Sequence, residues 1–328
     1  MYYKRNRLVT EALFYKLTLR AMLDGPTRKQ PDIKVTLLGT GGPELTRDRM
    51  GAATLIEAGG KPLLFDAGRG VLQRLYECGV HINSVTRVIL THLHSDHIDG
   101  LPNLWITPWF LLGRSEPMKF WGPHGTRKML VGMRDFLGHD VTHRVRHDCP
   151  AEALETPVNE FEGEGVIFDG EGCKVTAVPV HHPTGNPAYG FIIKANGRKV
   201  VMSGDCAFSE ELVQAGAGAD LTIHNVFAPS DELLNFEPHK RQVAMGLASP
   251  EQAGEFFRRS RSRMGVFSHV INLDSTDEDI LRRARSANYD GEMVIGADRM
   301  VLEVGDELRV RAPPPLDALQ DVTSRGHG

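Results

Sequence analysis

The sequence predicts an α/β protein with the architecture of a four-layer αββα sandwich. Strand-like apolar runs alternate with helical patterns from residue 33 onward, and a second strand-rich stretch with its own helices begins at residue 173. Each sheet must bury an apolar face, so two such halves are expected to pack sheet against sheet with their helices outside. The length of 328 residues and the hydrophobic content of 41% are enough for one large domain or two small ones.

The first half is expected to open on a strand at residues 33–38, followed by a hairpin over residues 55–65 that turns at Gly59-Gly60. Helical patterns follow at residues 71–78, 101–112 and 126–137. In the second half, strands are expected between residues 173 and 224, with a hairpin that turns at Asn196-Gly197. Helices are then expected at residues 250–260 and 276–288.

Both ends of the chain differ from the central region, which we predict to be one domain over residues 31–310. Residues 1–30 predict an amphipathic helical extension, because Glu11, Lys16 and Arg20 interrupt an apolar run. These charges argue against a signal peptide and a membrane span. The helix is expected to pack on its own domain or on a sister subunit, which leaves a homodimer open. Residues 311–328 are polar and punctuated by Pro and Gly, and they predict a flexible tail.

The overall charge indicates no preference for nucleic acid. The chain has 38 lysines and arginines against 42 aspartates and glutamates, a formal net charge of −4. The four cysteines, Cys78, Cys149, Cys173 and Cys206, show no CxxC spacing, so neither a disulfide framework nor a thiolate zinc site is expected. A reducing cytoplasm is therefore the expected location.

The strongest functional signal is the segment from His92 to His97, which follows the apolar run Val88-Ile89-Leu90. This segment crowds three imidazoles and a carboxylate that are costly to bury unpaired. A divalent cation explains them, because imidazole and carboxylate are zinc ligands. At a strand end, His92 and His94 stand two residues apart, so both rings point to the same side. Asp96 and His97 lie just beyond them and can serve a second ion.

This segment resembles the HxHxDH signature of the metallo-β-lactamase superfamily, whose fold is also an αββα sandwich. Other residues of the family pattern each stand where a β-prone run ends, and they are Asp66, His181-His182, Asp205 and His269. The stretches 65–70, 122–126 and 249–254 are similar to the branch that holds ribonuclease Z and the arylsulfatase-like hydrolases. The similarity runs from about residue 33 to residue 304.

The resemblance implies a binuclear zinc centre with two ions per chain. The ligands it assigns are His92, His94 and His182 for the first ion, Asp96, His97 and His269 for the second, and Asp205 as the bridge. The match of the Pro187–Gly190 stretch places His182, rather than its neighbour His181, in the ligand position. Catalytic roles are implied for Asp96, Asp205 and His182. Iron or manganese would suit the same ligands, and zinc is the default.

Further side chains are expected near the metals or the substrate, and they are Asp66, His181, His224, Trp105, Trp109 and Phe208. Asp66 is expected to hydrogen-bond near the metals and to orient one of them. Trp105 and Trp109 stand four residues apart on a helical pattern, so core packing explains them equally well.

Two departures from the ribonuclease Z pattern bear on the substrate. That pattern ends one strand in His-Glu and places a histidine shortly before the helix at residue 250, but this chain has Asn225 and Leu247 there. In the nuclease, the missing pair protonates the leaving group. A ribose 3′-alkoxide leaves poorly without an acid, whereas a phenolate with a pKa near ~10 leaves readily.

The acidic segment between His147 and Cys173 contains no Lys or Arg, and it is expected to repel phosphodiester backbones. We therefore predict a small-molecule substrate, a small organic ester of the arylsulfatase-like, aryl, enol or lactone type, and disfavour nucleic acid as a partner. A metal-bridging hydroxide would attack it, because two cations about 3.5–4 Å apart lower the pKa of water toward ~7. The alternatives are a ribonuclease Z-like tRNA 3′-endonuclease, a β-lactamase-type ring-opening hydrolase, and a non-hydrolytic binder that keeps the fold.

Overall fold

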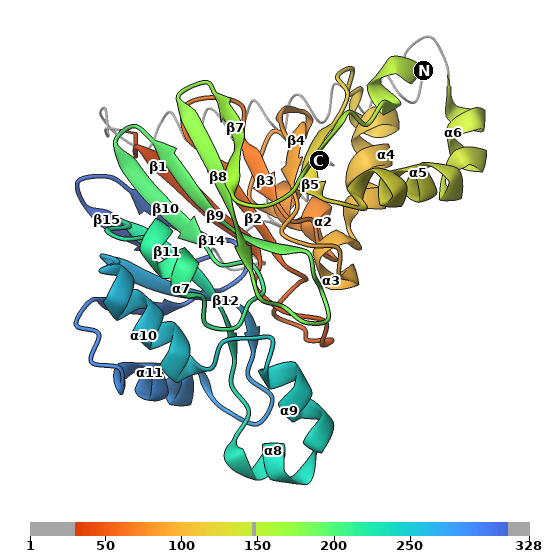
Figure 1. Cartoon of the computed structure of the whole chain (residues 1–328). Coiled ribbons are helices and arrows are strands. Elements are labelled where there is room, and N and C mark those ends of the chain that lie inside the picture. The colour runs from red at the N-terminus through yellow and green to blue at the C-terminus, as the bar shows by residue number, and fades with distance from the viewer. Residues whose placement is uncertain (1–29, 146–148, 314–328) are drawn as a thin grey trace, which may run out of the picture.

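The computed structural model of the chain describes residues 30–145 and 149–313 (Figure 1). The strands of the first sheet are β1 (Ile33–Gly39), β2 (Ala53–Glu57), β3 (Leu63–Phe65), β4 (Arg87–Ile89), β5 (Lys119–Pro123), β6 (Val158–Phe161), β14 (Met300–Val304) and β15 (Leu308–Arg311). Those of the second sheet are β7 (Gly165–Gly170), β8 (Cys173–Val180), β9 (Ala188–Ala195), β10 (Arg198–Met202), β11 (Leu221–Phe227), β12 (Met264–Ile271) and β13 (Glu292–Ile295).

The helices of these residues are α2 (Val71–Glu77), α3 (Ser95–Ile98), α4 (Leu101–Leu112), α5 (Thr126–Phe136), α6 (Gly138–Arg144), α7 (Glu210–Ala215), α8 (Asp231–Phe236), α9 (Pro238–Ala244), α10 (Pro250–Ser260) and α11 (Asp277–Arg285). Two short 3-10 helices are η1 (Ile82–Ser84) and η2 (Ala151–Leu154).

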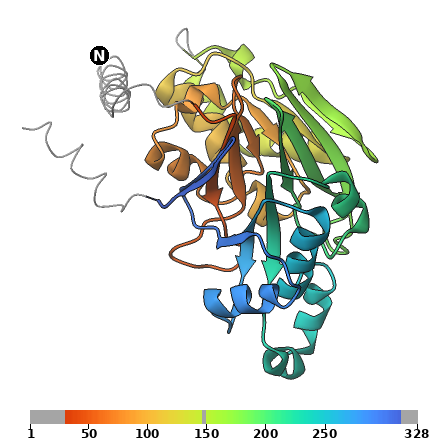
Figure 2. The same cartoon turned by 90° about the vertical axis from the view of Figure 1, so that its left-hand side faces the viewer.

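Both sheets mix parallel and antiparallel neighbours. The strand order is β15-β14-β1-β2-β3-β4-β5-β6 in the first sheet and β13-β12-β11-β10-β9-β8-β7 in the second. The last two strands therefore return to the first sheet, where β14 pairs antiparallel with β1. Figure 2 shows this return as the dark blue strands beside the red one.

Three apolar cores hold four layers together. The central core lies between the two sheets and contains Val35 and Leu37 of β1 together with Phe191 of β9. A second core lies between the first sheet and helices α2, α4 and α5, and a third lies between the second sheet and α7, α10 and α11. Burial of apolar surface on both faces of each sheet stabilises this stacking, at about 25 cal/mol per Å². The predicted αββα sandwich is thus confirmed.

The predicted elements agree with the observed ones to within a few residues. Helices α4 and α10 have the predicted bounds, and α10 begins at a capping box in which Ser249 and Gln252 bond each other's backbone. The two predicted hairpins turn where positive φ is needed, at Gly59 (φ 90°) and at Asn196-Gly197 (φ 51° and 77°). Helices α3, α6 and α7 were not predicted, and neither were α8 and α9. The latter two lie between β11 and α10 in the chain and project away from the sheets (Figure 1).

Among the described residues, no helix is long and apolar enough to cross a membrane. The helical extension predicted for residues 1–30 and the tail predicted for residues 311–328 fall almost entirely outside the described residues. Both stay predictions, as do the domain limits at residues 31 and 310.

Candidate metal centre

Strand ends from both sheets deliver the predicted ligands to one place. The segment His92–His97 follows β4 in the first sheet and runs into α3. From the second sheet, His182 follows β8, Asp205 follows β10, and His269 lies in β12. The structure brings these residues together in three overlapping groups whose ligand atoms lie within 4.8 Å of one another, namely His92–His94–His182, His92–His97–Asp205 and Asp96–His97–His269.

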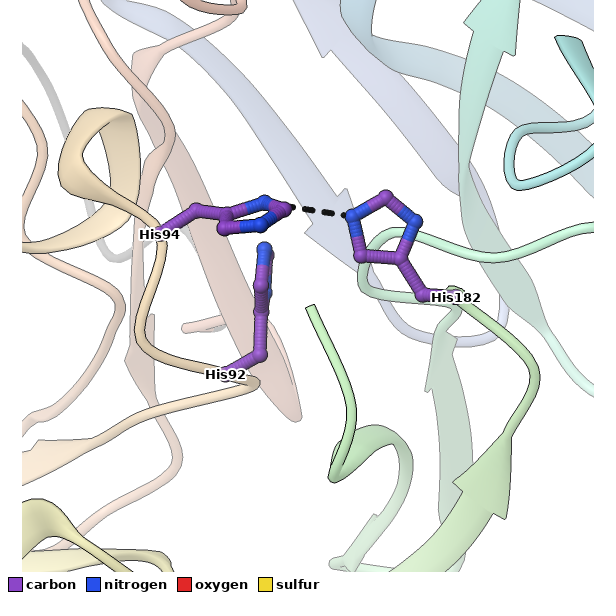
Figure 3. Close-up of side chains that lie close together, drawn as sticks. All are labelled: His92, His94 and His182. Carbon is purple, nitrogen blue, oxygen red and sulfur yellow. Dashed lines mark hydrogen bonds between the residues drawn. The ribbon is translucent and has the colours of Figure 1, made fainter. Parts of the chain in front are cut away.

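The first triad, His92, His94 and His182, consists of three imidazoles (Figure 3). His94 Nδ1 lies 3.2 Å from His182 Nε2, and the His92 ring centroid lies 4.6 Å from that of His94 and 5.0 Å from that of His182. Backbone oxygens orient two of the rings. His94 Nε2–H donates to the Thr184 carbonyl (2.9 Å) and His182 Nδ1–H to the Gly246 carbonyl (2.9 Å). Each ring therefore keeps its other nitrogen free to face the centre.

The second triad, Asp96, His97 and His269, adds a carboxylate to two imidazoles. Asp96 Oδ2 lies 3.0 Å from His269 Nε2 and 3.6 Å from His97 Nε2. All three side chains are buried. This triad is more acidic than the first and suits a cation that prefers mixed nitrogen and oxygen ligands.

Asp205 lies between the two triads. Its Oδ2 is 3.2 Å from His269 Nε2 and 4.0 Å from His182 Nε2, while its Oδ1 is 3.5 Å from His97 Nε2. The turn that presents it depends on Gly204, which has a φ of 58° and where a Cβ would lie 2.6 Å from the Tyr189 carbonyl oxygen. A carboxylate in this position can bridge two cations.

Asp66 and Thr91 fix two of the imidazoles from behind. The Asp66 carboxylate accepts hydrogen bonds from His97 Nδ1–H (2.8 Å) and from the N–H (2.8 Å) and hydroxyl (2.9 Å) of Thr91. The Thr91 oxygen in turn accepts from His92 Nδ1–H at 3.0 Å. Both rings thus point Nε2 toward the centre. Such a role was expected for Asp66 from the sequence. No role was predicted for Thr91, although its position directly before the HxHxDH motif was an available signal.

His269 reaches the centre through an irregularity in β12. Residues 225 and 226 of β11 pair with Ser268 and Val270, so His269 is the extra residue of a β-bulge. Its φ is 47°, which is uncommon for a residue other than glycine and concentrates at functional sites. The N–H of Val270 donates to the Thr40 carbonyl at 2.8 Å, which holds the bulge against the end of β1.

The surroundings favour different protonation states in the two triads. Burial lowers the pKa of His92 well below its ordinary value and also lowers the pKa of His182. Burial acts in the same direction on His97 and His269, but nearby carboxylates, above all Asp205, outweigh it. They raise the pKa of His97 well above its ordinary value and raise that of His269. Against the effect of burial, the two rings hold the pKa of Asp205 well below its usual range.

Buried donor atoms without partners indicate where cations fit. Among the described residues, His92 Nε2, His97 Nε2 and Asp205 Oδ1 are buried and have no hydrogen-bond partner. Leaving such atoms unbonded costs about 1–3 kcal/mol each, and coordination to a cation removes this cost. Imidazole nitrogen and carboxylate oxygen are the donor set of zinc, and they also accept iron or manganese. The residues present therefore fit a pair of divalent cations.

The structure places Trp105 and Trp109 away from any substrate surface. Both are at most 1% exposed and belong to the core between α4 and the first sheet. Their indole N–H groups donate to the carbonyls of Leu154 (3.2 Å) and Pro150 (2.9 Å). The expectation that these rings line the substrate pocket is therefore corrected. Packing on α4 accounts for their helical spacing.

Phe208 and His224 also face the helices of the second sheet. Phe208 packs beside Arg259, whose guanidinium lies 5.6 Å from the ring centre. The His224 ring contacts Phe256 of α10 at 4.8 Å, and burial lowers its pKa to about 4. His224 and Asn225 are consecutive residues of β11, and consecutive side chains of a strand point to opposite faces of the sheet. The His224 side chain therefore points away from the face on which Asn225 lies. Substrate contact is therefore not expected from either ring.

Of the adjacent histidines, His181 is exposed and His182 is buried. The ring of His182 belongs to the first triad, while the backbone carbonyl of His181 accepts the N–H of Ala207 at 3.0 Å. This arrangement agrees with the assignment of the ligand position to His182.

The two departures from the ribonuclease Z pattern are both buried. The Asn225 side-chain oxygen accepts a hydrogen bond from the Ser203 hydroxyl at 3.2 Å, and Leu247 packs in an apolar cluster with Phe227 and Ile271. A cavity of about 40 Å³, lined in part by Asn225 and His269, lies beside the second triad. At neither position does a side chain carry a proton for a leaving group.

The acidic segment lies on the edge strands β6 and β7. Glu160 of β6 accepts hydrogen bonds from the N–H groups of Gly125 (3.0 Å) and Arg127 (2.8 Å), where α5 begins. Glu171, directly after β7, forms an ion pair with Arg87. Part of the acidic charge is thus compensated within the fold, so the segment is less repulsive than its composition indicates.

A family model described as a beta-lactamase superfamily domain matches residues 62–270. The ribonuclease Z of Mycobacterium marinum is 32% identical over 277 residues, which cover 83% of this chain and 99% of that protein. The ribonuclease Z of Mycobacterium sp. strain KMS is 34% identical over 287 residues, with coverage of 86% and 97%.

Two solved structures are similar over most of the chain. The short form of human tRNase Z has a TM-score of 0.61 and 25% identity, and the match covers 86% of this chain and 100% of that one. The metallo-beta-lactamase fold protein YhfI from Bacillus subtilis has a TM-score of 0.65 and 19% identity, with coverage of 82% and 98%. The chain therefore belongs to the metallo-β-lactamase superfamily and is a metal-dependent hydrolase. The two ribonuclease Z proteins named above are among its relatives within that superfamily.

These relatives correct the predicted partner. The prediction of a small-molecule substrate, with nucleic acid disfavoured, is wrong, because the curated relatives are ribonucleases and the human structural relative is named for tRNA. The prediction depended on net charge and on an acidic segment. Neither of them determines the electrostatic potential at the metal centre, where a substrate would bind. The ribonuclease Z-like alternative agrees with the relatives better than the arylsulfatase-like hypothesis does.

Proposed function

We propose that the protein is a ribonuclease Z-like phosphodiesterase that cleaves tRNA precursors near their 3′ ends. The proposal is carried by two ligand triads that meet at Asp205 in a chain whose relatives are named ribonuclease Z. Phosphodiester hydrolysis suits such a centre, because a pair of divalent cations supplies a reactive water at neutral pH and neutralises charge on phosphoryl oxygens.

Each triad would hold one cation, with Asp205 shared between them. The hydrogen bonds of Asp66 and Thr91 keep the Nδ1 protons of His97 and His92 turned away from the centre. Both rings then present a lone pair rather than a proton to the cation. We further assign catalytic roles to Asp96, Asp205 and His182. Their side chains approach the space between the triads, where Asp205 Oδ2 lies 4.0 Å from His182 Nε2.

The leaving group is expected to take its proton from water. Neither Asn225 nor Leu247 carries an ionisable proton, and a positioned general acid contributes about 10²–10⁴-fold to such a step. We therefore expect slower cleavage than by an enzyme that has an acid at these positions.

The test uses zinc-loaded protein and a precursor tRNA with a labelled 3′ trailer. We expect a single cut that a chelator abolishes and added zinc restores. Asp205→Asn should reduce the rate by at least about 10³-fold, as for loss of an essential catalytic group, because both cations lose a ligand. The matched control is Asp290→Asn, at an exposed aspartate between α11 and β13, and it should cut like the wild type.

Two outcomes would contradict the proposal in different ways. A cut that survives both chelation and Asp205→Asn would reject the metal centre as its cause. Protein that hydrolyses bis(p-nitrophenyl) phosphate with zinc but leaves every RNA intact would reject RNA as the substrate and retain the hydrolase.

A further inference from the structure

Asp298 lies where the chain crosses from the second sheet to the first, between β13 and β14. Its neighbours tie this crossing to both sheets. The Gly296 N–H donates to the Phe267 carbonyl of β12 (2.8 Å), and the Arg299 N–H donates to the Leu37 carbonyl of β1 (2.6 Å). The Asp298 side chain is only 4% exposed. A carboxylate buried this deeply must be compensated by its partners.

Four hydrogen bonds converge on this carboxylate. Oδ1 accepts the N–H (2.9 Å) and the hydroxyl (2.8 Å) of Thr40. Oδ2 accepts the Met50 N–H (2.8 Å) and Arg74 Nε–H (3.0 Å). Charge-assisted bonds of this kind are stronger than neutral ones, so the carboxylate both offsets its own burial and fixes its donors. The two oxygens serve different segments of chain.

Through Oδ1, Asp298 reaches the backbone behind His269. Thr40 is held at its N–H and its hydroxyl, and its carbonyl accepts the N–H of Val270 at 2.8 Å. Val270 directly follows His269 in the bulge of β12. His269 has a φ of 47°, a conformation that persists only where the surroundings enforce it. The bond to Thr40 is one such constraint.

Through Oδ2, Asp298 reaches the backbone behind Asp96. Met50 precedes Gly51, which is packed so closely that a Cβ there would lie 2.7 Å from the Asp96 carbonyl oxygen. The Gly51 N–H donates to the Arg69 carbonyl at 3.1 Å, which fixes it from the other side. The position of Met50 therefore sets the surface against which the Asp96 turn rests.

We propose that Asp298 is a positioning residue for the second triad, one oxygen fixing the His269 side and the other the Asp96 side. It sets the spacing of two ligands that come from different sheets without touching either ligand. The rings of the first triad are held by their own bonds to nearby backbone and hydroxyl oxygens. The inference rests on the metal-binding part of the proposed function and not on RNA as the substrate.

The test is a titration of metal-free protein with Co²⁺, followed by absorption spectroscopy. Wild type is expected to bind two equivalents, and a His269→Ala variant identifies the spectrum of the second. In Asp298→Asn the second equivalent should bind about 10- to 100-fold more weakly, the usual cost of losing a partner that orients a metal ligand. The first should change less than about twofold, because no bond of the first triad depends on Asp298.

Two further variants separate positioning from loss of stability. Thr222→Val removes a buried hydroxyl that bonds Ser262 at 2.6 Å near the start of β11, away from the ligand end of the strand. It should lower the melting temperature and leave both Co²⁺ equivalents unchanged. Thr40→Val removes one of the four bonds to Asp298 and should weaken the second equivalent by a smaller factor. It also serves as the test should Asp298→Asn fail to fold.

Three results would overturn the inference, namely equal weakening of both equivalents in Asp298→Asn, an unchanged second equivalent in both Asp298→Asn and Thr40→Val, or a wild type that binds only one Co²⁺. A wild type that binds two Co²⁺ but cuts no RNA would reject the nuclease proposal and leave the role of Asp298 standing.

Discussion

The first triad consists of three imidazoles, whereas the second combines two imidazoles with the Asp96 carboxylate and lies against Asp66 and Asp205. Burial lowers the pKa values of His92 and His182, so these rings are neutral and ready to bind a cation. In the second triad the carboxylates outweigh burial, and the raised pKa values of His97 and His269 mean that these imidazoles keep their protons to a higher pH. A cation entering there must displace protons. The same ligand chemistry is thus set up for different responses to pH.

The two triads also differ in what holds them. The first is oriented by short-range bonds to backbone carbonyls at Thr184 and Gly246. The second depends on segments of both sheets that meet around Asp298. Disturbance of the segments around Asp298 should therefore reach the second triad first.

Removal of one imidazole from each triad should give the largest effect and the sharpest comparison. His182→Ala and His269→Ala should each reduce cleavage of precursor tRNA by at least about 10³-fold, because each takes a ligand from the centre. Their metal contents should differ. His269→Ala should keep the zinc of the first triad, where the lowered pKa values of His92 and His182 leave no proton to displace. His182→Ala keeps only the second site, where zinc must displace protons, and should therefore retain less zinc. The exposed His139→Ala on α6 is the control for loss of a histidine as such. Identical zinc contents of the two variants by elemental analysis would contradict the inferred difference between the triads.

A second prediction concerns Asn225 and Leu247, the two positions at which this chain departs from the ribonuclease Z pattern. One of them lies beside each triad. Asn225 pairs with Ser268 next to His269, and Leu247 follows Gly246, which holds His182. Asn225→Glu combined with Leu247→His would restore an acid pair of the ribonuclease Z pattern. A cavity of about 40 Å³, lined in part by Asn225, adjoins this position.

We expect the double variant to cut precursor tRNA about 10²-fold faster in single-turnover assays, at the low end of what a general acid contributes. Each single variant should gain less than about tenfold, because a relay needs both groups. Cleavage of bis(p-nitrophenyl) phosphate, whose leaving group needs no acid, is the control and should not change. Equal acceleration of both substrates would contradict the relay.

The residues that meet at the candidate metal centre and most elements of the fold could be predicted from the sequence, because both depend on patterns that are local in the chain. The HxHxDH motif follows a strand, and each further ligand stands where an apolar run ends. The bonds that orient those ligands could not be predicted in the same way. The carbonyls of Thr184 and Gly246 and the bulge at His269 have no residue-type signature, since any residue supplies a carbonyl.

The errors have physical causes of the same kind. The spacing of Trp105 and Trp109 fits a core helix and a pocket wall equally well, and only the placement of α4 against the first sheet decides between them. The acidic segment was judged by composition, yet Glu160 and Glu171 find partners far away in the sequence. Partner prediction from net charge failed because the field at a site depends on the folded arrangement.

Zinc affinity should respond to pH in only one of the two triads. Lowering the pH from 8 to 6 should weaken the binding of the second zinc, by at most about tenfold per pH unit for each proton displaced, because the pKa values of His97 and His269 are raised. The first zinc should change little over this range, since the pKa values of His92 and His182 are lowered. Competition with a chromophoric chelator measures both constants. Parallel pH dependence of the two constants would show that the triads do not differ as inferred.

The smallest expected effect is the pH dependence of stability in the metal-free protein. His92 and His182 have folded-state pKa values below the unfolded value near ~6.5. As the pH falls below about 6.5, these two rings bind protons more readily in the unfolded protein, so the folded protein becomes less stable. His97 and His269 have raised values. The stability they contribute is fully present below about pH 6.5 and is lost as the pH rises through their folded-state values.

The two triads should therefore give stability slopes of opposite sign that meet near pH 6.5. In chelator-treated protein we expect a maximum of the melting temperature there, with a fall of about 2–4 °C on each side, equivalent to about 1 kcal/mol. Scanning calorimetry from pH 5 to 8 measures it. His269→Ala should flatten only the alkaline side and His182→Ala only the acidic side, because each removes one titrating ring from its triad. A melting temperature that rises steadily through pH 8 would mean that the carboxylates near His97 and His269 do not raise the pKa values of these rings.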